Sequence, residues 1–158
     1  MKIILVLPFL IFGCGKIAAP DQLTVKKEYY ENGQLKIEYH YKDDFKHGEA
    51  TSYYPNGAIK EKASFINGEI EGSVVSYYEN GNKDIQGSYV NGLLDGEWIK
   101  YYDNGVVELE GSYKMGIRDG KWNLYLINGE ILEATIYENG EVKSLENFQH
   151  RYLVPEIL

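Results

Sequence analysis

The sequence predicts an all-β fold: a single elongated antiparallel meander of about ten strands, built from 24-residue repeats, with a short helix capping its C-terminal end. Three observations support this prediction. A pair of aromatic residues recurs at a fixed spacing of 24. Glycine-containing turns follow at two constant places in each repeat. Between the turns, apolar and polar residues alternate with a period of two, as in half-buried antiparallel strands.

The repeats are defined by Tyr-Tyr at 29–30, 53–54, 77–78 and 101–102, with Tyr-Leu at 125–126. A first Asn-Gly turn follows each pair, and most repeats carry a second Asn-Gly turn later. Because a type I′ turn needs positive φ at both central residues, Asn-Gly predicts a hairpin at each of these places. The five units therefore lie near 29–52, 53–76, 77–100, 101–124 and 125–142, within an array that spans 23–142.

The last segment, 143–158, departs from the repeat. Leu145, Phe148, Tyr152 and Leu153 have helical spacing, and Ser144 is a suitable residue to begin a helix. We expect a short helix here that covers the last strand and protects the open edge of the sheet. A tail that lies free, or in the sheet's own groove, is the alternative.

The N-terminus carries an apolar run over 3–13 that is too short to span a bilayer alone, since a spanning helix needs about 20 residues. It ends in Ile11-Phe12-Gly13-Cys14, which resembles the lipobox of bacterial lipoproteins. The resemblance implies a signal peptide over 1–13, a lipid (palmitate among its chains) on Cys14, a tether over 14–22, and export to the bacterial cell envelope. An ordinary signal peptide or anchor helix with an incidental cysteine is the alternative.

Composition excludes several classes of function. The formal net charge of −8 disfavours nucleic acid, which demands a basic surface. One cysteine and three histidines without ligand spacing argue against a metal centre. The recurring acids Glu71, Asp95 and Asp119 raise the alternative of calcium, but calcium needs six or more oxygen ligands. No nucleophile or acid–base constellation stands out, so we expect no enzymatic activity and no cofactor.

The stretches 95–105 and 119–122, which read Asp-Gly-Glu-Trp and Asp-Gly-Lys-Trp at their starts, resemble the variant MORN repeat. More narrowly, they resemble the bacterial YwqK-type repeat proteins often labelled antitoxins. The likeness covers 29–142. Trp98 and Trp122 carry the tryptophan of that family, where earlier units have Ala50 and Val74. The resemblance implies a scaffold made only of sheet, without catalytic residues, that contacts proteins or, in some eukaryotic relatives, membrane lipid.

Aromatic residues form the candidate site. Tyrosine has an apolar body and a polar tip, and Tyr and Trp are enriched in binding hot spots. We predict an aromatic binding face made of Tyr30, Tyr54, Tyr78, Tyr102, Trp98 and Trp122. The leading hypothesis is a monomeric, non-catalytic, membrane-anchored scaffold that binds a protein. The alternatives are a module for phospholipid or glycan headgroups and an antitoxin-like or immunity protein.

Overall fold

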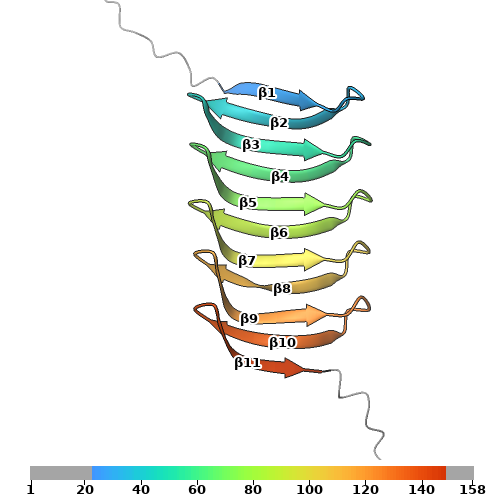
Figure 1. The fold of residues 1–158 in the computed structure, drawn as a ribbon, viewed down its shortest axis with the longest axis vertical. Helices are drawn as coiled ribbons and strands as arrows, with labels where there is room; N and C mark the ends of the chain where they lie inside the picture. Colours follow the sequence, from blue (N-terminus) through green and yellow to red (C-terminus); the bar gives the residue numbers. More distant parts are fainter. Residues whose placement is uncertain (1–22, 149–158) are drawn as a thin grey trace, which may run out of the picture.

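A computed structural model describes residues 23–148, which form one antiparallel sheet of eleven strands in sequential order (Figure 1). The predicted meander is confirmed, with one strand more than expected. The strands are β1 (Thr24–Tyr29), β2 (Leu35–Lys42), β3 (Phe45–Tyr53), β4 (Ile59–Ile66), β5 (Glu69–Tyr77), β6 (Lys83–Val90), β7 (Leu93–Tyr101), β8 (Val107–Lys114), β9 (Ile117–Tyr125), β10 (Ile131–Glu138) and β11 (Glu141–Asn147).

The sheet is a single layer, so few side chains are removed from water. Figure 1 shows the strands stacked one above the next as a long ladder, with turns along both margins. Trp122 is the largest side chain that is fully buried among the described residues, with 2% of its surface exposed. The other buried residues are small, as expected where the only cover comes from neighbouring side chains on the same face: Ala50, Thr51, Ala63, Ala134 and Thr135.

The two kinds of turn have different geometry. In the second turns, Asn67-Gly68 and its equivalents have positive φ at both residues, so the predicted type I′ conformation is correct there. In the first turns only the glycine is left-handed, for example Gly33 with φ 82°. The amide of Gly33 donates to the carbonyl of Tyr30 at 2.9 Å, and the amide of Tyr30 donates to the carbonyl of Gln34 at 2.8 Å. This is a type I turn followed by a bulge, and the type I′ prediction is wrong for it.

The asparagine of the first turn does not adopt the positive φ that was predicted for it, and acts instead through its side chain. The Oδ1 atom of Asn32 accepts a hydrogen bond from the amide of Gln34 at 3.0 Å, and every later repeat makes the equivalent bond. Asparagine is therefore selected here for its side-chain acceptor and not for positive φ. The type I geometry also explains Pro55, which occupies the second position of its turn, where φ near −65° is required.

Neighbouring repeats are joined at the second turns. The amide of Gly92 donates to the carbonyl of Ile70 at 3.1 Å, and equivalent bonds recur along the margin. The recurring acids cap the same turns: a carboxylate oxygen of Glu71 accepts from the amide of Asn91 at 2.8 Å, and one of Asp95 accepts from the amide of Met115 at 2.9 Å. Glu71 and Asp95 therefore cap these turns. Within 23–148 no group of three or more potential metal ligands occurs.

The C-terminal prediction is wrong in its first residues. Ser144 to Asn147 belong to β11, which pairs with β10 from Glu138↔Glu141 to Glu133↔Asn147. Leu145, the first residue of the predicted helical pattern, instead pairs with Thr135, because the edge of β10 offers backbone hydrogen bonds to this segment. Phe148 is also outside any helix, and its amide donates to the carbonyl of Leu132 at 2.9 Å. The rest of the predicted cap, from 149 on, lies outside the described residues, as do the signal peptide, Cys14 and the tether. In the part of the chain that is described, no helix has the length and hydropathy needed to cross a membrane.

Candidate functional site: an aromatic band on one sheet face

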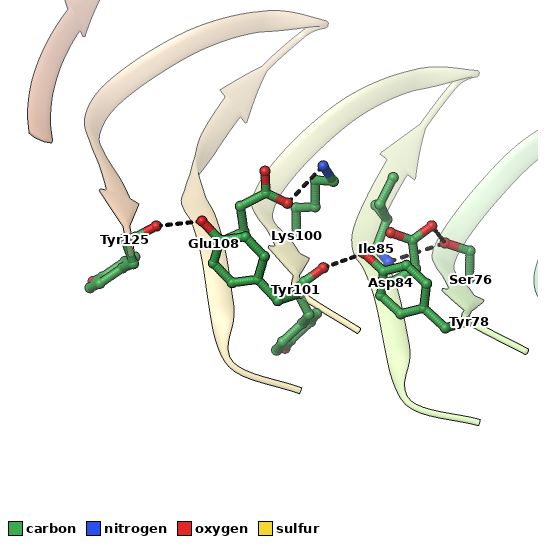
Figure 2. Close-up of polar contacts among 9 residues, drawn as sticks. Ser76, Tyr78, Asp84, Ile85, Lys100, Tyr101, Glu108 and Tyr125 are labelled. Carbon is green, nitrogen blue, oxygen red and sulfur yellow. Dashed lines mark hydrogen bonds and ion pairs between the residues drawn. The ribbon is translucent and has the colours of Figure 1, made fainter. Parts of the chain in front are cut away.

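The tyrosines predicted as the binding face form a hydrogen-bonded ladder along one margin of the sheet. Each hydroxyl donates to the backbone carbonyl that ends the next odd-numbered strand, at distances of 2.6–2.8 Å. Figure 2 shows Tyr78 reaching the carbonyl of Tyr101 in this way. We call Tyr30, Tyr54, Tyr78 and Tyr102 the tyrosine ladder. All four side chains are half-buried. Their role in binding stays a prediction, while their hydroxyls link one repeat to the next.

The surroundings of Tyr78 hold its phenol neutral. Burial, followed by a hydrogen bond and the negative charge of Asp84, raises the pKa of Tyr78 to about 12. Ser76 donates to the Asp84 carboxylate at 3.3 Å and accepts from the amide of Ile85 at 3.1 Å (Figure 2). Burial also raises the pKa of Tyr54. These tyrosines therefore act as hydrogen-bond donors over the whole physiological pH range.

A second aromatic surface lies on one face of the strands themselves. Directly opposed residues of antiparallel strands point to the same face, and so do alternate residues along a strand. The pairs Tyr41↔Lys46, Tyr89↔Leu94 and Tyr113↔Arg118 therefore share a face. We call the four rows of this face that lie nearest the second turns the ring band: Tyr41, Phe65, Tyr89, Tyr113, Tyr137; Lys46, Ile70, Leu94, Arg118, Val142; Tyr39, Ala63, Gly87, Gly111, Thr135; and Lys26, Ala50, Val74, Trp98, Trp122.

The rings of the ring band concentrate on β7 to β10. The Trp122 ring lies 5.6 Å from that of Trp98, 5.1 Å from that of Tyr113 and 6.3 Å from that of Tyr137. The contacts with the two tyrosines are edge-to-face, an arrangement that aromatic pairs favour. Trp122 is buried at the centre, while Trp98, Tyr113 and Tyr137 remain half-exposed around it. Of the two predicted tryptophans, only Trp98 therefore presents surface to a partner directly.

Arg118 completes this cluster and was missed by the sequence-based prediction. Its guanidinium carbon lies 4.1 Å from the centre of the Trp122 ring, and its Nη1 donates to the Tyr137 hydroxyl at 3.2 Å. Burial lowers the pKa of Arg118, but the hydrogen bonds to Tyr113 and Tyr137 raise it by more, so that its net shift is upward. The available signal was its position opposite Tyr113 after a second turn, where other repeats have Lys46, Ile70 and Leu94.

A comparison with protein-family models matches the MORN repeat variant over 25–43, 46–67, 70–91 and 94–115, just over half of the chain. The chain belongs to the MORN repeat variant family. Each matched MORN repeat is one hairpin, from β1–β2 to β7–β8, that surrounds a first turn. The β9–β10 hairpin has the same geometry beyond the matched residues. A comparison with curated proteins finds no match.

The MORN repeats differ in how they fill the ring band. Where a repeat supplies tryptophan, the facing position on the preceding strand is glycine. A Cβ atom added to Gly87 would lie 3.0 Å from Cδ1 of Trp98, and one added to Gly111 would overlap the Trp122 ring. In the earlier repeats the facing pairs are Tyr39↔Ala50 and Ala63↔Val74. Side-chain volume is therefore complementary across each strand pair.

The opposite face of the sheet in this region is polar, and its groups are bonded within the sheet except for Asn123 Oδ1, which is buried without a hydrogen-bond partner. A shallow depression of about 260 Å³ is lined by Glu97, Ile99, Glu110, Ser112, Lys121 and Asn123, together with Gly111. One oxygen of Glu110 accepts from the Asn123 amide at 3.2 Å and from the Tyr125 hydroxyl at 2.5 Å. Burial and this carboxylate raise the pKa of Tyr125 to about 12. Because Glu110 is already bonded within the sheet, the ring band is the stronger candidate for recognition.

Proposed function

We propose that this MORN-repeat chain is a non-catalytic scaffold, held at the bacterial cell envelope by a lipid on Cys14, which binds another protein through the ring band. The observation that carries the proposal is the cluster around Trp122. It offers two half-exposed tyrosines, a half-exposed tryptophan and a half-buried arginine on a surface that no second layer of the described chain covers. Tyr, Trp and Arg are the residues that dominate the energetics of protein interfaces.

Rigidity supports the same proposal. The buried Trp122 ring contacts the rings of Trp98 and Tyr113, and Arg118 is held against it by stacking and by the Tyr137 hydroxyl. Side chains that are held in place before binding lose little conformational entropy on binding. A partner that covers these rings therefore loses little of its binding free energy to the ordering of side chains.

The anchor is proposed from the sequence alone, since Cys14 lies outside the described residues. Several acyl chains would hold the protein firmly, because a single chain gives only marginal membrane binding. Metabolic labelling with a palmitate analogue tests this part. We expect label on the wild-type chain and none on Cys14→Ser. Equal labelling of both proteins would contradict the anchor.

Glycan binding is the second candidate, because half-exposed rings such as Trp98 and Tyr113 are also suitable for stacking on sugars. An array of glycans and lipid headgroups, probed with the chain, separates this candidate from protein binding. Immunity or antitoxin-like action is a special case of protein binding, in which the captured partner is a toxin.

Affinity capture from the native envelope tests the protein-binding proposal. A double variant, Trp98→Ser with Tyr113→Ser, removes half-exposed rings and leaves Trp122 in place. The matched control is Tyr29→Ser, which removes a ring that is 59% exposed on β1, at the far end of the sheet. We expect the double variant to lose a partner that wild type and control both retain, while circular dichroism shows folded sheet in all three. Retention of every partner by the double variant would contradict the proposal.

A further inference from the structure

The charges on the ring band differ from those of the rest of the chain. The full sequence has 24 acidic and 16 basic residues, yet no position of the four ring-band rows is Asp or Glu. The acids of the same face, Glu28, Glu61 and Glu133, lie one row further toward the first turns. It contains three cations, Lys26, Lys46 and Arg118. Each of them lies over aromatic rings: Lys26 is 4.2 Å from the centre of the Tyr41 ring, and Lys46 is 3.9 Å from that of Tyr39.

These three cations have no carboxylate partner among residues 23–148. Elsewhere in the sheet cations and acids do form pairs, as in Lys27–Glu38 at 2.7 Å, Lys62–Glu49 at 3.7 Å and Lys100–Glu108 at 2.7 Å. Lys46 and Arg118 are moreover half-buried. A partly desolvated cation stacked on a ring keeps its full charge and its unused N–H donors, and both favour an anionic group from outside.

The spacing of the cations defines the shape of a ligand. Lys46 is on β3 and Arg118 on β9, in equivalent positions of repeats that lie six strand spacings apart, or about 29 Å at ~4.8 Å per spacing. The equivalent positions between them are apolar, Ile70 and Leu94. An extended peptide covers that distance in about nine residues at ~3.3 Å each.

We propose that the partner presents an acidic, extended protein segment that crosses the strands of the ring band. One carboxylate of the segment meets Lys46 and another, about nine residues away, meets Arg118, with apolar side chains between them over Leu94 and Trp98. This inference rests on the proposed function and specifies the partner's chemistry. A membrane surface fits the arrangement less well, because anionic lipid is held by clustered basic residues and this chain is acidic overall.

Peptide selection tests the inference on the full-length chain in detergent micelles. A phage library of random 15-residue peptides is selected for binding, and the affinities of enriched peptides are measured by tryptophan fluorescence. Trp98 and Trp122 are the only two tryptophans of the sequence, and both belong to the ring band. We expect enriched peptides to carry Asp or Glu at two places about nine residues apart, with apolar residues between.

Two charge variants provide the matched comparison. Lys46→Gln with Arg118→Gln removes two cations from the ring band, while Lys62→Gln with Lys121→Gln removes two from the polar face and leaves the same net charge. We expect the first pair of substitutions to lower the affinity for the enriched peptides at least about tenfold. This is the loss expected for one charge-assisted hydrogen bond or more. The second pair should change binding less than about twofold. Replacing the peptide acids with amides should reproduce the first loss.

Other outcomes would overturn the inference, and they separate its failure from the failure of the proposed function. Enriched peptides that lack acids, or that bind equally to both charge variants, contradict the acidic partner and leave the proposed function intact. A library without any binder contradicts the inference; if envelope capture also yields no partner, the proposed function fails as well. Binding to phosphatidylglycerol vesicles that is lost with Lys46 and Arg118, without peptide binding, would assign the ring band to lipid instead.

Discussion

The β4–β5 and β8–β9 strand pairs have the same backbone arrangement and opposite distributions of side-chain volume. On β4–β5, Ala63 faces Val74, so that two small residues share the space. On β8–β9, Gly111 has no side chain at all and the whole space belongs to Trp122. A single-layer sheet has no second sheet that could fill a void or move away from a side chain that is too large. The side-chain volumes of each strand pair must therefore complement each other.

The comparison shows how a repeat protein can specialise one stretch without changing its fold. The alanine and valine of β4–β5 leave only small side chains between the two strands. The glycine and tryptophan of the later repeats build a rigid aromatic platform, on which Arg118 and the half-exposed rings are held. The two kinds of pair should therefore differ in stability, in tolerance of substitution and in partner binding.

Removing Trp122 should have the largest effect. Truncating a buried tryptophan costs about 3–5 kcal/mol, and Trp122 is 2% exposed. We expect Trp122→Ala to reduce the free energy of unfolding by about 3 kcal/mol, and Val74→Ala, its equivalent in the earlier repeat, by about 1 kcal/mol. Urea denaturation followed by circular dichroism measures both. Equal losses would contradict the difference between the repeats.

Adding one methyl group to Gly111 should be the next largest change. Its Cβ would overlap the Trp122 ring, and overpacking of this kind costs about 1–3 kcal/mol. Gly111→Ala combined with Trp122→Val recreates the Ala63–Val74 combination. We expect the double variant to be more stable than the sum of the two single losses predicts. An additive result in the double-mutant cycle would show that the two positions do not share one space.

The tyrosine ladder should respond to alkaline pH. The pKa of Tyr78 is raised to about 12 in the fold, whereas an unfolded tyrosine ionises near pH 10. The stabilisation from neutral Tyr78 is therefore complete below about pH 10 and is lost as the pH rises from 10 to 12. Tyr78→Phe should cost about 1 kcal/mol at neutral pH, since it removes the hydrogen bond to Tyr101, and should flatten the alkaline decline.

Tyr29→Phe is the control for the ladder, because Tyr29 is 59% exposed on an edge strand. Unfolding midpoints at pH 7, 10 and 11 measure the effect. If both variants decline alike with pH, the raised pKa of Tyr78 has no influence on stability.

The smallest effect concerns the second turns. Met115 has φ 50° in its Met-Gly turn. The equivalent residues Asn67, Asn91 and Asn139 are asparagines with φ 51–53°. Asparagine tolerates this left-handed conformation better than methionine. We expect Met115→Asn to raise the free energy of unfolding by about 0.5–1 kcal/mol, and Asn91→Met to lower it by a similar amount. Thermal unfolding detects both, and a destabilised Met115→Asn would contradict the turn assignment.

The sequence was sufficient for the meander because a period-24 pattern leaves little choice of strand order. It was insufficient where one residue type serves two geometries. Asn32-Gly33 and Asn67-Gly68 read alike, but only the second has positive φ at both residues. The helical spacing after Ser144 was outweighed by the backbone hydrogen bonds that β10 offers to β11.

The candidate site was predictable in part. The aromatic rows and the two tryptophans were visible from spacing, but their burial depends on which strand faces which. The hydroxyls of the tyrosine ladder could not be assigned from spacing, because their acceptors are backbone carbonyls 23 residues away. Arg118 escaped because its importance comes from the Trp122 ring beneath it.

The central claim is that the ring band contacts a protein partner. Site-specific photo-cross-linking in the intact envelope tests it most directly, with a benzophenone amino acid in place of Tyr113 on the ring band or of Ile99 on the polar face. We predict a discrete cross-linked protein from position 113 and none from position 99. Cross-linking from 99 alone, or from neither position in cells that contain the partner found by affinity capture, would contradict the account.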